Sequence, residues 1–166
     1  MTDGVSYVLD ANVFIEAARR YYAFDLVPAF WTKLEELAAH HYIHSIDRVK
    51  QELDRGKDEL SSWAAGNFAP AFDSTDDEDI IAQYRSLMSW VQLHNQFLDM
   101  AKSDFAGSAD GWLIAYAKVK GRTVVTHEVL AQDAKAHIPI PNVCLAFDVQ
   151  YVDTFQMLRN LGVRLT

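Results

Sequence analysis

The chain has 166 residues, 50% of them hydrophobic, which predicts a single α/β domain over residues 1–166 with a substantial core. No stretch approaches the roughly 20 apolar residues of a membrane span, and the N-terminus lacks the pattern of a signal peptide, so we expect a cytosolic protein with no membrane partner. The 23 acidic residues outnumber the 15 basic ones, and the net charge of -8 argues against nucleic-acid binding unless clustered acids hold divalent cations.

The N-terminal half alternates between short β-like runs and amphipathic helices. In chain order we predict a strand over 6–9, helices over 12–20 and 28–41, a strand over 42–46, a helix from 47 that breaks at 55–56, and helices over 58–65 and 77–93. Asp10 directly follows the first strand, and Glu52 lies on the helix after the second. Residues 66–76 contain Pro70 and an acidic run and are interpreted as a solvated loop.

The C-terminal half continues the alternation of helix and strand. In chain order we predict a helix over 96–102, a break at 106–108, a helix over 110–120, a strand over 123–126, an irregular stretch at 139–141, a helix after 153 that runs to 161, and an edge strand over 163–165. Asp110 opens a helix, and Glu128 follows a β-branched strand. Cys144, in an apolar run, is expected to be a buried reduced thiol.

Strands that alternate with helices predict a mostly parallel sheet of about four or five strands, with helices on both faces. Ligands in such folds bind beyond the carboxyl ends of the strands. Asp10 and Glu128 both occupy that kind of position, while Asp110 begins a helix and Glu52 lies on one. These four acids, although distant in sequence, could therefore converge.

Converging carboxylates repel one another in a partly buried cleft, and this repulsion indicates that they hold cations. Ligands that are all oxygen favour Mg²⁺ or Mn²⁺, and the chain offers no convincing set of cysteine and histidine ligands for zinc. One or two such ions can activate a water and hold a phosphate oxygen in phosphodiester hydrolysis. Hydrolysis of RNA follows as a hypothesis.

Four segments resemble sequence signatures of the PIN-domain superfamily. Residues 7–15, Tyr-Val-Leu-Asp-Ala-Asn-Val-Phe-Ile, are similar to its N-terminal signature, in which a hydrophobic strand delivers the first metal-binding acid. Residues 48–53 resemble the helix of the second acid, and residues 109–115 resemble the helix of the third. Residues 124–128, Val-Val-Thr-His-Glu, resemble the segment that normally reads Thr-Asn-Asp. The similarity covers nearly the whole chain and is greatest to the DUF4411-like group, which is related to VapC-type toxins.

This resemblance implies a PIN-like three-layer α/β/α fold and a metal-dependent endoribonuclease. Asp10, Glu52 and Asp110 would hold Mg²⁺ or Mn²⁺, and Glu128 would complete the site. The resemblance also implies a toxin that acts on RNA, a cognate antitoxin that occludes the cleft, and a homodimer. Two departures stand out. His127-Glu128 replaces Asn-Asp and gives a fourth ligand one methylene longer. Gly111 is expected to loosen the start of the helix that carries the third acid, Asp110.

Two other functions are compatible with the pattern. A non-catalytic PIN-like module could bind RNA or a protein, as the altered fourth acid and the negative charge suggest. A haloacid-dehalogenase-like phosphatase also places an aspartate after its first strand, but it needs an acid two residues later, where this chain has Asn12.

Each candidate residue also has an ordinary structural explanation. Aspartates before helices are favoured caps, which applies to Asp10 and Asp110, and lone glutamates are most often solvated, which applies to Glu52 and Glu128. Asn12 and Ser108 either support the site by hydrogen bonds or cap helices.

Three further groups of residues were considered for binding. The histidines at 40, 41 and 44 are numerous enough to suggest a metal cluster. They lie where a helix ends and a strand begins, however, so their side chains are expected to point in different directions. Residues 19–24 mix arginines with aromatics, as surfaces that stack single-stranded RNA do, although packing or a partner surface is the favoured interpretation. Lys118, Lys120 and Arg122 are interpreted as solvated helix-end charges.

Overall fold

The computed structural model describes residues 4–166 and contains a five-stranded sheet in the order β3-β2-β1-β4-β5. All four strand pairs are parallel, which confirms the prediction of a mostly parallel sheet. The strands are β1 (Tyr7–Leu9), β2 (Ile43–Ile46), β3 (Phe72–Asp73), β4 (Thr123–Val125) and β5 (Tyr151–Val152). Because β1 is central, the residue that follows it lies in the middle of the carboxyl edge of the sheet.

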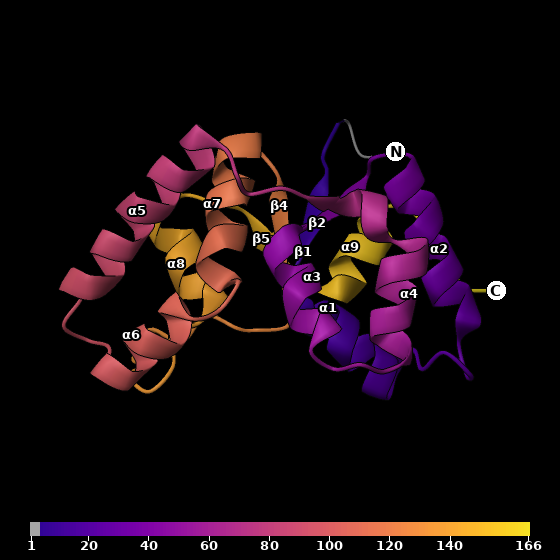
Figure 1. The fold of residues 1–166 in the computed structure, drawn as a ribbon, viewed down its shortest axis with the longest axis horizontal. Helices are drawn as coiled ribbons and strands as arrows, with labels where there is room; N and C mark the ends of the chain where they lie inside the picture. The colour runs from indigo at the N-terminus through magenta and orange to yellow at the C-terminus, as the bar shows by residue number, and fades with distance from the viewer. Residues whose placement is uncertain (1–3) are drawn as a thin grey trace.

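Helices cover both faces of this sheet, as Figure 1 shows, so the three-layer prediction is confirmed. One layer contains α1 (Ala11–Glu16), which continues as a π-helix over Ala17–Tyr21, α2 (Pro28–Ala39), α4 (Glu59–Asn67) and α9 (Thr154–Asn160). The other contains α5 (Glu78–Leu93), α6 (Asp99–Ala106), α7 (Asp110–Lys120) and α8 (Ile140–Ala146). Helix α3 (Asp47–Asp54) packs against α1 and α4. None of the helices in residues 4–166 is long and apolar enough to cross a membrane.

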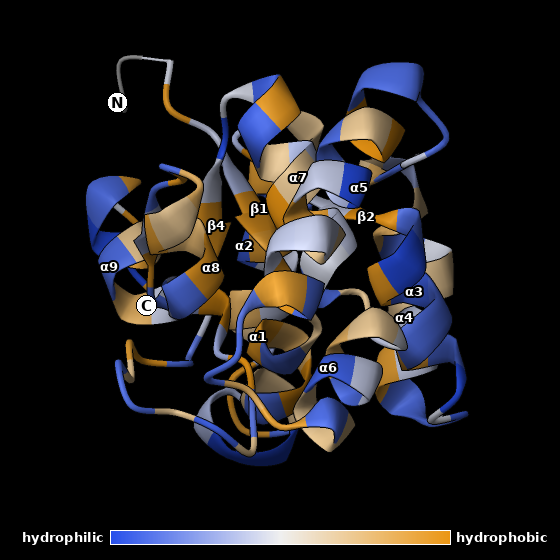
Figure 2. Cartoon of the chain, turned by 90° about the vertical axis from the view of Figure 1, so that its left-hand side faces the viewer, coloured by the Kyte–Doolittle hydropathy of each residue, from blue (hydrophilic) through white to orange (hydrophobic). Residues whose placement is uncertain are grey.

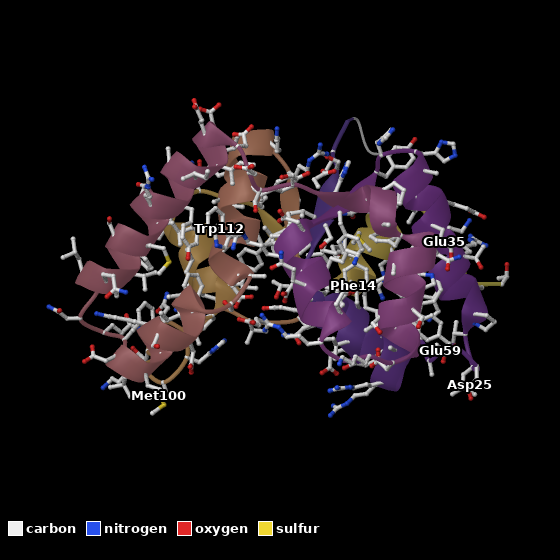
Figure 3. All side chains as sticks on the ribbon, viewed as in Figure 1. Phe14, Asp25, Glu35, Glu59, Met100 and Trp112 are labelled. Atoms are coloured by element: carbon white, nitrogen blue, oxygen red, sulfur yellow. The ribbon has the colours of Figure 1, made fainter. Side chains whose placement is uncertain are left out.

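The strands form the centre of the core. Tyr7, Val8 and Leu9 of β1 are at most 2% exposed, and Figure 2 shows β1, β2 and β4 as mainly hydrophobic ribbons. Phe14, labelled in Figure 3, packs on one face of the sheet with its ring 5.5 Å from that of Phe68. Full burial of one large apolar side chain contributes about 1.5–3 kcal/mol. This packing holds α1, and with it the end of β1, in a fixed position.

Four predicted elements differ from the structure. The loop over 66–76 contains a short 3₁₀ turn (Ala69–Ala71) and the edge strand β3, which pairs with Ser45 and Ile46 of β2. The predicted helix over 96–102 instead spans Asp99–Ala106. The stretch at 139–141 begins α8, because proline is tolerated in a first helical turn. The edge strand over 163–165 is absent, and Tyr151–Val152 pairs with β4 in its place.

Candidate functional site

Asp10 lies where β1 ends and α1 begins, between strand and helix. Its backbone N–H donates to the carbonyl of Val125 at 3.0 Å, so β4 fixes its position. The side chain is 2% exposed and makes no capping bond to α1. Its Oδ2 instead accepts a hydrogen bond from Thr126 Oγ1 at 3.3 Å. Asp10 therefore occupies the N-cap position without serving as a side-chain cap.

Glu52 and Asp110 meet where α3 packs against the start of α7. Glu52 Oε1 accepts a hydrogen bond at 3.0 Å from the backbone N–H of Ala109, the residue before Asp110. Ser108 Oγ accepts from the Asp110 N–H at 3.3 Å and donates to the Phe105 carbonyl at 2.9 Å. Ser108 thus bonds to backbone groups on either side of it, while Ala109 occupies the N-cap position of α7. Asn12, by contrast, is exposed on α1.

Glu128 is oriented by groups from a segment that follows it in the chain. Its Oε1 accepts from the Ile140 backbone N–H at 2.9 Å and lies 3.1 Å from His137 Nε2. Its own N–H donates to Thr126 Oγ1 at 3.1 Å, so one hydroxyl joins the Glu128 backbone to the Asp10 carboxylate. Thr126 and His137 were not identified as site residues from the sequence.

The four carboxylates share one electrostatic environment. Burial, followed by repulsion from Asp110, Glu128 and Glu52, raises the pKa of Asp10 well above its ordinary range. Burial and the charges of Glu128 and Glu52 raise the pKa of Asp110 to about 7, against a smaller lowering by His137. The carboxylates of Glu52, Asp110 and Glu128 therefore lie within electrostatic reach of Asp10.

The donor chemistry of this acidic group fits a hard divalent cation. All four side chains offer oxygen, and the raised pKa values of two of them show a local excess of negative charge. Within residues 4–166, however, no three histidine, cysteine, aspartate or glutamate side chains stand in a ready-made metal-binding arrangement. Binding of one ion by these oxygens would therefore require the side chains to move.

Three shallow cavities surround the acidic group. They have volumes of about 140, 180 and 120 Å³, and Glu52, Ser108 and Asp110 are among the residues that line them. A larger cavity of about 380 Å³ lies elsewhere, between α2 and the β3 edge, and is lined in part by His41, His44 and Asp73. We place the candidate site at the acids because burial and neighbouring carboxylates raise the pKa of both Asp10 and Asp110.

The other residues considered from the sequence have mainly structural contacts. His44 is buried with its Nδ1 3.3 Å from Asp73 Oδ2, and the rings of His41 and His44 are stacked at 6.2 Å. Tyr22 stacks on Phe30 at 4.2 Å. Tyr21 is half exposed, and its ring lies 5.8 Å from that of His127 and 5.6 Å from that of Phe155.

The helix-end charges at the close of α7 are also partly engaged by the protein. Lys118 Nζ donates to the carbonyl of Phe147 at 2.7 Å, and Arg122 donates to Ser6 Oγ at 2.6 Å. Lys120 is exposed. These contacts fix the end of α7 that lies opposite the acidic group.

Comparison with known families gives the affiliation of the chain. Residues 7–165 match the family described as "Domain of unknown function (DUF4411)". The chain belongs to the DUF4411 family. No curated protein matches this DUF4411 chain. The predicted resemblance to the DUF4411 group is confirmed.

Solved structures share the fold of the DUF4411 protein at low sequence identity. A structure of FitAB bound to an IR36 DNA fragment has a TM-score of 0.54 and 22% identity, with 89% of this chain and 94% of that chain covered. FitAcB from Neisseria gonorrhoeae gives 0.54 and 21%, covering 87% and 95%. VapBC2 from Rickettsia felis, bound to a DNA fragment from its promoter, gives 0.54 and 14%, covering 90% and 98%. At such identities the likeness establishes the fold.

Proposed function

We propose that this DUF4411 protein is an endoribonuclease that depends on Mg²⁺ or Mn²⁺. The main support is the acidic group itself, in which Asp10, Glu52, Asp110 and Glu128 come from four distant segments to one edge of a parallel sheet. The strongest single observation is that Asp110 is partly buried beside Glu128 and Glu52, and that burial together with these two charges raises its pKa to about 7. A bound cation would relieve the repulsion among these carboxylates. The PIN-like fold adds support by analogy alone.

The side chains divide into ligands and groups that position them. Asp10, Glu52 and Asp110 would supply the carboxylate oxygens. Glu128 would complete the set, and its side chain is oriented by the contacts of Oε1 with Ile140 and His137. A divalent cation in this position would lower the pKa of a water and stabilise charge on the phosphate oxygens. Thr126 keeps Asp10 turned toward Glu128 through its hydroxyl.

A toxin role with a protein antitoxin is part of the proposal. It is supported by the resemblance to VapC-type toxins and by structural similarity to FitAB and VapBC2. We propose that the antitoxin covers the cavities around Glu52 and Asp110 and that the chain forms a homodimer. Co-expression with the product of an adjacent small reading frame should suppress cleavage in a purified complex. Full cleavage by such a complex would contradict this part of the proposal.

The replacement Asp10→Asn tests the proposed activity directly. It keeps the size of the side chain but removes a buried carboxylate, so Mn²⁺-dependent cleavage of single-stranded RNA should fall by at least about 100-fold. Because the lost charge is repelled by three others, the free energy of unfolding in metal-free buffer should not decrease. Circular dichroism and urea unfolding provide the folding control. Turnover at the wild-type rate by a well-folded variant would contradict the assignment.

A non-catalytic binding module is the competing function. It is favoured by one observation, that the acids of residues 4–166 are not preassembled into a metal-binding arrangement. Calorimetric titration with Mn²⁺ distinguishes the two functions. The nuclease proposal requires that Mn²⁺ binds and that Asp110→Asn weakens this binding. A non-catalytic module need not bind Mn²⁺. A phosphatase of the haloacid-dehalogenase type would need an acid where the chain has Asn12.

A further inference from the structure

A small polar pocket lies beside the acidic group, between α3 and the start of α7. Its volume is about 120 Å³. It is lined by the side chains or backbone of Arg48, Gln51, Glu52, Arg55, Ala106, Gly107, Ser108, Ala109 and Trp112. The pocket therefore shares Glu52 with the candidate site and adjoins Asp110, and it is also lined by Arg48 and Arg55, which lie on and directly after the same helix as Glu52.

Arg48 is held in place by contacts on two sides. Its guanidinium carbon lies 3.8 Å from the centre of the Trp112 ring, which in turn stacks on Tyr84 at 3.8 Å. Figure 3 labels Trp112 on α7. Arg48 Nε donates to Thr75 Oγ1 at 3.0 Å, and that buried threonine is bonded twice by the Asp47 carboxylate. The planar guanidinium is thus fixed before any ligand arrives.

Neither arginine of this pocket forms an ion pair within the part of the chain that the structure describes. Among the residues at 4–166, no carboxylate oxygen lies within 4.0 Å of a side-chain nitrogen of Arg48 or Arg55. Nε is the only nitrogen of the Arg48 side chain that hydrogen-bonds within this part of the chain, which leaves its two terminal nitrogens for a ligand. Arg55 is exposed at the end of α3. A protein of net charge -8 thus presents two arginines that form no ion pair in a pocket next to its acids.

We propose that this pocket binds a phosphate group of single-stranded RNA that neighbours the phosphate at the acidic group. This inference rests on the proposed function and names a contact to its substrate. Guanidinium groups offer paired N–H donors that match phosphate oxygens. The fixed position of Arg48 reduces the ordering cost of binding. The pocket explains how RNA approaches an acidic surface, since the cations lie where the backbone must pass.

The test measures binding of RNA without cleavage. In the Asp10→Asn background, fluorescence anisotropy with a labelled single-stranded RNA is recorded over a range of salt concentrations. Arg48→Gln and Arg55→Gln should each weaken binding by roughly tenfold, the effect of one hydrogen-bonded charge. Loss of one phosphate contact should reduce the slope of log affinity against log salt by about 0.7. Arg164→Gln, which removes the same charge from an exposed site away from this pocket, should change affinity by less than about twofold.

Two further measurements make the test decisive. Arg48→Lys keeps the charge but loses the planar fork, so its affinity should lie between those of wild type and Arg48→Gln. Arg55 is exposed, so Arg55→Gln remains informative if the Arg48 variants fold poorly, which urea unfolding would reveal.

The outcomes separate this inference from the nuclease proposal. If RNA is not cleaved by wild type but binding shows the predicted losses, the nuclease proposal fails and the phosphate pocket stands. If well-folded arginine variants bind RNA with unchanged affinity and salt slope, the pocket assignment is overturned, whether or not wild type cleaves RNA. Absence of measurable RNA binding in the Asp10→Asn background would overturn the pocket assignment, whereas the nuclease proposal is decided by cleavage with wild type.

Discussion

Asp110 is a carboxyl group that the fold holds in an unfavourable environment. Its ordinary pKa is near 4, and burial together with Glu128 and Glu52 raises it to about 7. Between these two values the folded chain keeps a proton that the unfolded chain has released. Folding and proton binding at this one residue are therefore linked.

This linkage predicts how stability depends on pH in the metal-free protein. Because the folded state binds more protons, the free energy of unfolding should fall as pH rises from about 4 to about 7 and then level off. In wild type this fall in the free energy of unfolding should be on the order of 1–3 kcal/mol, and it should be absent in Asp110→Asn. Urea unfolding at several pH values measures it in both proteins. Asp25→Asn, at an exposed acid labelled in Figure 3, is the matched control. Parallel pH profiles for wild type and Asp110→Asn would contradict the prediction.

The sequence identified the acids by context but not the residues that position them. Asp10 follows an apolar run and Asp110 opens a periodic helix, and both patterns are local. Thr126 and His137 act through partners that are distant in the chain or joined by irregular backbone, so neither leaves a periodic signal. His127 likewise lies 2.6 Å from Thr154 Oγ1, and burial lowers its pKa, which its place in the motif does not predict.

At the scale of elements, α7 depends on a glycine in its first turn. The sequence suggested that Gly111 loosens this helix, whereas the structure shows that it permits close packing. A Cβ at this position would lie 3.0 Å from Tyr84 Cε1 and 3.1 Å from Phe105 Cε2. Tyr84 has little freedom to move because it is stacked on Trp112. Gly111 therefore allows α5 and α6 to pack against the start of α7, where Asp110 lies.

Gly111→Ala should destabilise the protein despite the better helix propensity of alanine. Overpacking typically costs about 1–3 kcal/mol, which exceeds the roughly 1 kcal/mol gained from propensity when the neighbours cannot move. Gly66→Ala is the matched control, because a Cβ there meets no atom within 4 Å and should be neutral or stabilising. Chemical denaturation measures both variants. An increase in stability for Gly111→Ala equal to that of Gly66→Ala would show that the contact is not tight.

Strands β1, β2 and β4 match their predicted ranges within one residue, and so do two helices with long periodic patterns. Helices α5 and α7 match their predicted ranges within one residue, because their apolar spacing is fixed by the face they bury. Strands β3 and β5 have two residues each, and neither shows an alternating pattern. Their strand conformation comes from pairing with β2 and β4, which depends on tertiary structure.

For the whole molecule, the acidic group links stability to divalent cations. We expect Mn²⁺ to raise the midpoint of thermal unfolding at pH 8 and much less at pH 5, because protons compete for the same carboxylates. Binding at 100 times the dissociation constant contributes about 2.7 kcal/mol, or roughly 5–10 °C for a chain of this size. A chelator should reverse the shift, and NaCl at equal ionic strength is the control. Equal shifts at both pH values, or from NaCl alone, would contradict this expectation.

The pairing of β1 with β4 also determines when the acidic group is assembled during synthesis. Asp10 and Thr126 are joined by a hydrogen bond across 116 positions, and Glu128 and its partner His137 are made later still. A nascent chain on the ribosome therefore has its first acid long before the strand that must lie beside it. The four carboxylates therefore remain apart until β4 and the segment that positions Glu128 have been made and have packed beside β1.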